Sequence, residues 1–132
     1  FRGGNYTLGR QNYYPNPKKD RRIMTIGEAM GKSCNPVFGR IALEMLSPEV
    51  LRTYSKMFGF NTDLKCDVPI TPSIASIPDD DYEFSRTGAG FGAVTISPVH
   101  AAAMMSGIAN EGKLPRPTFV DKIIAPTGVV LY

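Results

Sequence analysis

The stretch TIGEAMGKSCNPVFGRIALEML, residues 25–46, predicts two helices separated by a short polar junction. Thr25 and Glu28 have the spacing of a capping box, which marks the start of a helix. The first helix should therefore begin after Thr25 and continue to about Lys32. Beyond the junction, apolar residues recur at helical spacing on one face: Val37, Phe38, Ile41, Ala42, Met45 and Leu46.

The junction is the triplet Ser33-Cys34-Asn35. Asn35 followed by Pro36 is typical of an N-cap and a first helical position, so we expect the second helix to begin there. A hydroxyl and a carboxamide would then project side by side from the break between two helices. Because Ser and Asn are also common helix caps, the spacing alone leaves a catalytic role and a capping role equally open.

Two more helices are expected. Ser47-Pro48-Glu49 predicts the start of one helix, which should end at Gly59. Ser97-Pro98 predicts the start of another, which is nearly apolar all round and should be buried on most sides, including Met104 and Met105. The buried face of the earlier helix is expected to hold four residues: Val50, Leu51, Tyr54 and Met57.

The remaining segments are expected to be less regular. Residues 60–86 contain three prolines and an acidic run at 79–81, which predict an ordered connector with at most one short strand or turn. Residues 119–124 and 129–132 are expected to form two short strands around a turn at 126–128.

Composition excludes several classes of protein. The 132 residues carry 15 Lys and Arg against 12 Asp and Glu, and this net charge of +3 is too small for a nucleic-acid-binding surface. One histidine and two cysteines exclude a His-rich metal site, a four-cysteine zinc site and a disulfide-dense scaffold, so no metal or cofactor is expected. No apolar run is long enough to span a bilayer, and no direct membrane contact by this segment is expected.

At three other candidate sites the sequence favours a structural role over a functional one. The glycines at 88, 90 and 92 lack the GxGxxG spacing and an immediately following helix, so we expect a tight turn instead of a phosphate loop. His100, the single histidine, lies in the first turn of a mostly buried helix, which is typical of a structural residue. Cys34 has no histidine dedicated to it as a base, and the spacing leaves a Cys34–Cys66 disulfide open.

Residues 25–38 resemble the second-motif region of penicillin-binding protein transpeptidases, where a short helix precedes Ser-x-Asn and an aromatic residue follows. KMFGF at 56–60, GFG at 90–92 and ANEGK at 109–113 resemble later stretches of the same family, in the same order, and the resemblance covers about residues 23–124. The chain departs from the family pattern at three positions: Phe91 and His100 stand where Gln is usual, and Ser97 where Thr is usual.

The resemblance implies a mainly α fold within an α+β whole. The part that the resemblance implies is the helical subdomain of the penicillin-binding/β-lactamase-like fold, with one or two short strands near the C-terminus. Residues 1–22 would be a polar loop or arm, and residues 23–132 a partial transpeptidase domain. In this family a serine attacks the D-Ala–D-Ala amide, or the β-lactam that mimics it, by acyl transfer. The resemblance gives Ser33 the relay of a proton to the leaving amine and Asn35 a hydrogen bond to the substrate amide, so both are predicted catalytic and substrate-binding residues.

Two of the three family motifs are missing from this sequence. No serine is followed by lysine three positions later, and Lys-Thr-Gly does not occur, since Pro126 precedes Thr127-Gly128. We therefore expect this chain alone to be inactive and its parent to be a membrane-anchored D,D-transpeptidase on the periplasmic or extracytoplasmic face. The parent would bind peptidoglycan stem peptides and β-lactams, and the fragment would tend to self-associate through exposed apolar surface.

Two alternatives remain. One is a non-catalytic penicillin-binding-like scaffold or interaction module, whose parent would have a degenerate first motif. The other is an unrelated small helical interaction domain, in which Ser33 and Asn35 would be buried caps with no cleft beside them.

Overall fold

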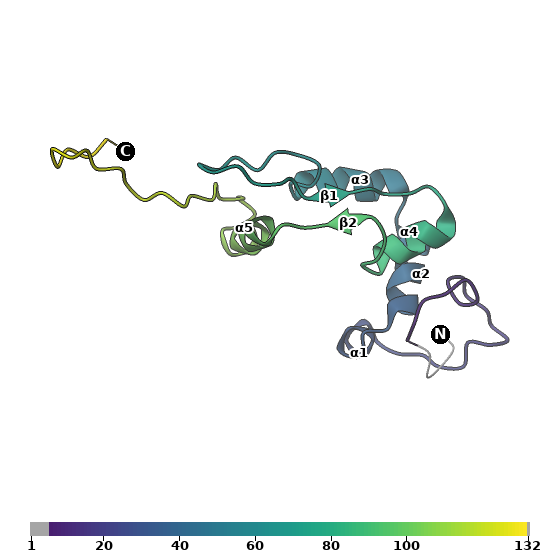
Figure 1. The fold of residues 1–132 in the computed structure, drawn as a ribbon. Coiled ribbons are helices and arrows are strands. Elements are labelled where there is room, and N and C mark those ends of the chain that lie inside the picture. Colours follow the sequence, from purple (N-terminus) through teal and green to yellow (C-terminus); the bar gives the residue numbers. More distant parts are fainter. Residues whose placement is uncertain (1–5, 132) are drawn as a thin grey trace. The chain divides into compact units, whose positions relative to one another are not determined.

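The computed structural model describes residues 6–131, and within them the chain is mainly helical (Figure 1). The chain divides into two compact units: the first holds the described residues up to Ser55 together with Ala75–Val94, and the second holds Lys56–Ile74 and the residues from Thr95 onward. The predicted fold class is confirmed. The described elements are α1 (Ile26–Gly31), α2 (Asn35–Met45), α3 (Pro48–Met57), β1 (Ile74–Ala75), α4 (Asp81–Gly88), β2 (Val94–Thr95) and α5 (Pro98–Ala109), with β1 and β2 paired in a two-stranded sheet.

Side-chain caps begin α1 and α5 as the sequence predicts. The Thr25 hydroxyl accepts the Glu28 N–H at 3.2 Å, and the Glu28 carboxylate accepts the Thr25 N–H at 2.8 Å, which completes the capping box. Ser97 caps α5 by accepting the N–H of His100 at 3.1 Å. These contacts are local in sequence, which is why sequence alone predicts them.

The expectation that residues 60–86 contain no helix is wrong, because α4 covers residues 81–88. Asp80 caps this helix by accepting the Glu83 N–H at 3.0 Å, and Asp81 and Glu83 lie in its first turn. Negative charges there interact favourably with the positive end of the helix dipole. The acidic run is thus the start of a helix, whose Phe84 is buried.

The predicted C-terminal hairpin is present only as an isolated antiparallel bridge between Ile124 and Val130. Ala125 donates its N–H to the Val129 carbonyl at 2.8 Å, so the turn at 126–128 forms as expected. Tyr132, the last residue of the second predicted strand, lies outside the described residues. The short strand expected within 60–86 is β1, whereas β2 has no counterpart among the predictions.

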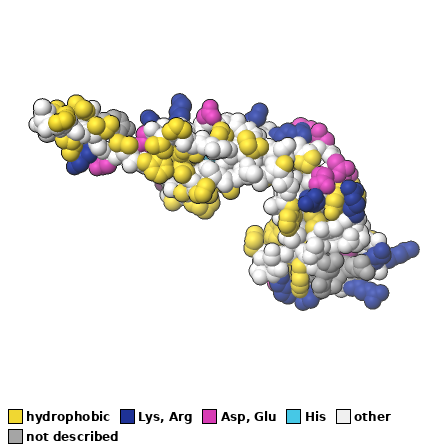
Figure 2. Space-filling view, in the orientation of Figure 1, with side chains coloured by type: hydrophobic (Ala, Val, Ile, Leu, Met, Phe, Trp, Pro, Cys, Tyr) yellow, Lys and Arg dark blue, Asp and Glu magenta, His cyan; other side chains and the backbone are white. Residues whose placement is uncertain are grey.

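Burial is less extensive than the apolar patterns predict. No residue of α3 is buried, and Met57 on its predicted inner face is 72% exposed. In α5, Met104 is half-buried and Met105 is 60% exposed, so the prediction that this helix is buried on most sides is wrong. On α2, Ala42 is buried but Met45 is exposed, and Figure 2 shows many apolar side chains on the visible surface. The patterns identify faces that the described residues leave largely uncovered.

The packing that organises the first unit is the contact of α2 with α4. A Cβ atom placed on Gly39 would lie 2.5 Å from the Ser85 hydroxyl oxygen. A Cβ atom placed on Gly88 would overlap the Ala42 side chain. The two helices therefore approach closely because the residues at their contact are small, and this brings the start of α2 near the end of α4.

The polar segment before α1 packs onto these same helices. Arg40 of α2 forms an ion pair with Asp20 at 2.8 Å and donates to the Asn12 carbonyl at 3.0 Å. The Arg10 guanidinium lies 4.4 Å from the centre of the Tyr82 ring of α4, a cation–π contact. The boundary between this arm and the rest, expected at residues 22 and 23, stays a prediction.

The Asp20–Arg40 pair makes stability depend on pH. Burial on its own would raise the pKa of the Asp20 carboxyl, but hydrogen bonds from Arg40 and the Asn16 N–H, with the Arg40 charge, lower the pKa below its ordinary 3.8. The unfolded chain then binds the proton more readily than the folded chain. This contribution to stability is complete above the unfolded pKa and is lost as pH falls through the folded pKa.

Gly88→Ala should lower the free energy of unfolding by about 1–3 kcal/mol, because the added methyl group has no room beside Ala42. Urea denaturation followed by far-UV circular dichroism measures the change. Gly31→Ala is the matched control, since Gly31 also ends a helix and no atom lies within 4 Å of its added Cβ. Equal losses in both variants would show that the α2–α4 contact tolerates a larger residue.

Asp20→Asn should cost about 1.5–3 kcal/mol near neutral pH, the range for hydrogen bonds to charged groups. It should also weaken the loss of stability between about pH 5 and pH 3, because the group that titrates there has been removed. Urea midpoints measured across this range test both effects. Asp63→Asn, at an exposed carboxylate, is the control, and an unchanged pH profile for Asp20→Asn would contradict the assignment.

Candidate functional site

Backbone hydrogen bonds hold the Ser33-Cys34-Asn35 junction to α1 and to the segment that precedes α1. The Cys34 N–H donates to the Ala29 carbonyl at 2.8 Å, and the Asn35 N–H donates to the Tyr6 carbonyl at 3.1 Å. The prediction that Asn35 is the N-cap is wrong by one residue: Cys34 is the N-cap, and Asn35 is the first residue of the helix. No side chain makes a capping hydrogen bond there, so the Asn35 carboxamide is not used as a cap.

Ser33 has a φ of 50°, in the left-handed region that non-glycine residues rarely occupy. This conformation costs roughly 1–2 kcal/mol for an L-residue. The Ser33 N–H donates to the Met30 carbonyl at 3.0 Å, which closes the end of α1 and holds the turn. Strained backbone of this kind concentrates at functional sites, where the surrounding structure enforces it.

Ser33 and Asn35 line one cleft in the first unit, with a volume of about 280 Å³. Ser33 is exposed and Asn35 is half-buried. Within residues 6–131, neither side chain forms a hydrogen bond to the protein, so the hydroxyl and the carboxamide are both open to a ligand. The remaining walls are Met30, Phe38, Gly88, Ala89 and Gly90.

The cleft supplies hydrogen-bonding groups but no titratable one. A serine hydroxyl donates and accepts, and an asparagine carboxamide does both at separate atoms, so the pair suits recognition of an amide. The predicted roles of Ser33 and Asn35 stay predictions, and the residues that line the cleft include no Asp, Glu, Lys or His that could act as a base.

None of the five other wall residues was predicted as part of a site. Met30 precedes the junction, and Ala89 and Gly90 belong to the turn after α4, which adopts the tight conformation expected of it: Gly90 has a φ of 88°. Only the close α2–α4 contact brings this turn to the junction. Sequence carries no direct signal for that approach beyond the small residues Gly39 and Gly88.

The other candidates from sequence have structural surroundings. His100 is 2% exposed, and its Nε2 atom lies 2.7 Å from the Phe58 carbonyl oxygen. Cys34 is buried and Cys66 half-buried, and both are free thiols, so the disulfide left open by the sequence is not formed. No group of His, Cys, Asp and Glu among the described residues is arranged to hold a metal ion, and no helix there is long and apolar enough to cross a membrane.

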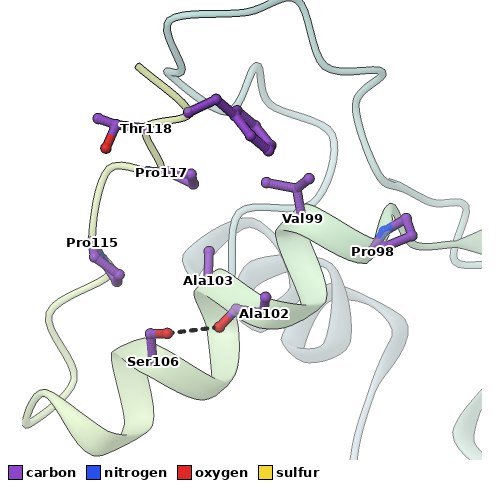
Figure 3. Close-up of a pocket in the computed structure, with 9 residues that line it drawn as sticks. Pro98, Val99, Ala102, Ala103, Ser106, Pro115, Pro117 and Thr118 are labelled. Carbon is purple, nitrogen blue, oxygen red and sulfur yellow. Dashed lines mark hydrogen bonds between the residues drawn. The ribbon is translucent and has the colours of Figure 1, made fainter. Parts of the chain in front are cut away.

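A second hollow, of about 400 Å³, lies along α5 in the second unit (Figure 3). Its walls are mostly proline, alanine and other apolar side chains, including Pro98, Val99 and Pro117. The Ser106 hydroxyl donates to the Ala102 carbonyl of its own helix at 2.9 Å, so it is already bonded. This hollow offers apolar surface and little chemistry.

The comparisons with known proteins agree on one family. A family model described as the penicillin binding protein transpeptidase domain matches residues 3–129. Penicillin-binding protein 3 of Bacillus subtilis (strain 168) is 33% identical over 96 residues, which are 71% of this chain and 14% of that protein.

Solved structures of penicillin-binding protein A from Mycobacterium tuberculosis are similar in fold. One matches with a TM-score of 0.74 at 25% identity, and covers 86% of this chain and 26% of its own. Its imipenem acyl-enzyme complex matches with a TM-score of 0.74 at 26% identity, and covers 92% of this chain and 28% of its own. The chain thus spans only a small part of the length of these relatives.

The stability of variants at Ser33 should depend on how well the new residue adopts the left-handed backbone conformation. Ser33→Gly should be tolerated, because relief of the left-handed strain offsets the entropy that glycine loses on folding. Ser33→Val should destabilise the protein more than Ser33→Ala, because a β-branched side chain fits this conformation worst. Urea denaturation of the three variants gives the order, and equal stability of the Val and Gly variants would contradict a strained φ.

Proposed function

Because the chain belongs to the penicillin-binding protein transpeptidase family, we propose that it forms the helical part of a transpeptidase domain within a longer parent protein. The parent would be a serine D,D-transpeptidase that cross-links peptidoglycan stem peptides. The match of the family model to residues 3–129 supports the domain. The small share that the chain covers of its relatives, 14% of one and 26% of another, supports a longer parent.

The observation that carries the proposal is the cleft in which Ser33 and Asn35 both present unbonded polar groups. In the proposed reaction, a serine elsewhere in the parent attacks the carbonyl carbon of the D-Ala–D-Ala amide. The Ser33 hydroxyl passes a proton toward the leaving amine, and the Asn35 carboxamide binds the substrate amide. A free hydroxyl and carboxamide are the groups these two steps require.

Binding of β-lactams is part of the same proposal. The structures of M. tuberculosis penicillin-binding protein A include acyl-enzyme complexes with imipenem and ceftriaxone. We extend this reaction to the parent of the present chain. The residues described here hold neither a Ser-x-x-Lys nor a Lys-Thr-Gly motif, so the isolated chain should form no acyl-enzyme.

The proposed location is the outer face of the cytoplasmic membrane, with the parent anchored there. The proposed substrate and the family both support this location, since peptidoglycan stem peptides are cross-linked outside the membrane. The exposed apolar faces of α3 and α5, such as Met57 and Met105, would pack against the rest of the parent. In the isolated chain the same faces would promote self-association.

The direct test is labelling of the full-length parent with a fluorescent penicillin, followed by peptide mapping of the labelled residue. Labelling of a serine outside residues 1–132 supports the transpeptidase and a role for the cleft beside it. A folded parent that takes up no label would favour a non-catalytic scaffold of the same fold.

Asn35→Ala in the parent should slow acylation by about ten- to a hundredfold, because loss of a hydrogen bond to the substrate costs about 1–3 kcal/mol. Stopped-flow measurement of the second-order acylation rate constant quantifies this loss. Asn110→Ala is the matched control, since Asn110 is the C-cap of α5 and should affect stability alone. An unchanged acylation rate in folded Asn35→Ala would remove Asn35 from the proposed mechanism.

A further inference from the structure

A basic surface lies on the turn that precedes α1 in the first unit. Residues 18–22 read KKDRR, and the side chains of Lys18, Lys19 and Arg21 are all exposed. Among the described residues, none of these three side chains forms an ion pair. Figure 2 shows Lys and Arg side chains that project from this part of the first unit. The three charges are therefore available to an external anion.

The single carboxylate in this run is turned inward. The Asp20 side chain is 16% exposed and forms a two-point ion pair with Arg40 of α2, at 2.8 and 3.3 Å. The same carboxylate accepts the Asn16 N–H at 2.7 Å. Because Arg40 already neutralises Asp20 from within, the Asp20 charge does not offset the cations on either side of it.

The turn that carries these cations is held by the protein. The N–H groups of Lys19 and Asp20 both donate to the Asn16 carbonyl, at 2.9 and 2.7 Å. The ion pair with Arg40 then fixes the turn to α2. A partner that bound here would meet an ordered backbone, so the entropy of ordering this turn would not oppose binding.

We propose that Lys18, Lys19 and Arg21 form a contact surface for the anionic phospholipid headgroups of a membrane. The inference goes beyond the proposed function and uses only the location proposed for the parent, at the outer face of the cytoplasmic membrane. Each Lys or Arg near an anionic membrane strengthens binding by about fivefold. The sequence predicts no direct membrane contact because no apolar run can span a bilayer, but a surface that binds from one side needs no such run.

The composition of the surface favours lipid over a protein or a small anion. Lysine is depleted in protein–protein interfaces, whereas aromatic residues and arginine are enriched there. Neither of the two hollows described above is lined by these cations, so neither could hold a small anion against them. Ile23, two residues beyond Arg21, is 99% exposed. An exposed aliphatic side chain beside cations is typical of surfaces that bind a membrane from one side.

Co-sedimentation of the 132-residue chain with lipid vesicles tests the proposal. Vesicles of phosphatidylcholine are compared with vesicles of equal parts phosphatidylcholine and phosphatidylglycerol, and samples without vesicles correct for protein that sediments by itself. The chain should bind the anionic vesicles and not the neutral ones. Binding should weaken as added salt shortens the Debye length from about 10 Å at 0.1 M to about 3 Å at 1 M.

Lys18→Ala combined with Lys19→Ala should lower the partition coefficient by about thirtyfold, because two cations are lost from the surface. Lys18→Arg combined with Lys19→Arg keeps both charges and should bind as the wild type does. Lys113→Ala combined with Lys122→Ala is the matched control, since it removes the same charge from two exposed lysines of the second unit. This control should change binding by less than about twofold.

Equal losses in the two alanine double variants would show that net charge alone drives binding, and would overturn the assigned surface. Equal binding to neutral and anionic vesicles, or binding to neither, would overturn it as well. Retention on a poly-glutamate resin without binding to anionic vesicles would assign the cations to an acidic polypeptide instead of a lipid. Penicillin labelling of the parent does not depend on these results, so failure of this inference is distinguishable from failure of the proposed function.

Discussion

The close approach of α2 to α4 is the contact on which the candidate site depends. Gly39 lies against Ser85 and Gly88 against Ala42, and neither glycine has room for a side chain. Close-packed interiors tolerate little change in volume, so the separation of the two helices is fixed by these residues. That separation places the turn after α4 opposite the Ser33–Asn35 junction and creates the cleft. With larger residues at the contact, the same junction would face solvent on an open surface.

Helix caps could be predicted from neighbouring residues in the sequence. Features that depend on contacts between distant residues could not. The capping box at Thr25 and the cap at Ser97 depend on residues three positions apart, and both appear in the structure as expected. The helix α4 was missed because its N-cap, Asp80, lies in an acidic run that also suits an exposed loop. Family resemblance predicted roles for Ser33 and Asn35, which stay predictions, whereas Ala89 joins the cleft only through tertiary packing.

The exposed apolar faces illustrate what a hydrophobic pattern predicts. Periodicity identifies the side of a helix that avoids water, but it does not say which partner covers that side. In α3 the expected inner face is open, with Tyr54 54% exposed. In α5 only three residues along one narrow side are buried: His100, Ala103 and Gly107. The chain covers 26% of a related structure. In the proposed arrangement, the remainder of a longer protein would therefore supply much of the surface that covers these apolar faces.

The left-handed conformation of Ser33 has a consequence for ligand binding. Its backbone is held by hydrogen bonds from Ser33 and Cys34 to α1, so the turn is formed during folding. A ligand that bound at this turn would meet a backbone that is already ordered, so the entropy of ordering that backbone would be absent from the free energy of association. The free energy needed to hold this unfavourable backbone geometry is thus supplied during folding by the packing of the whole unit, and not by ligand binding.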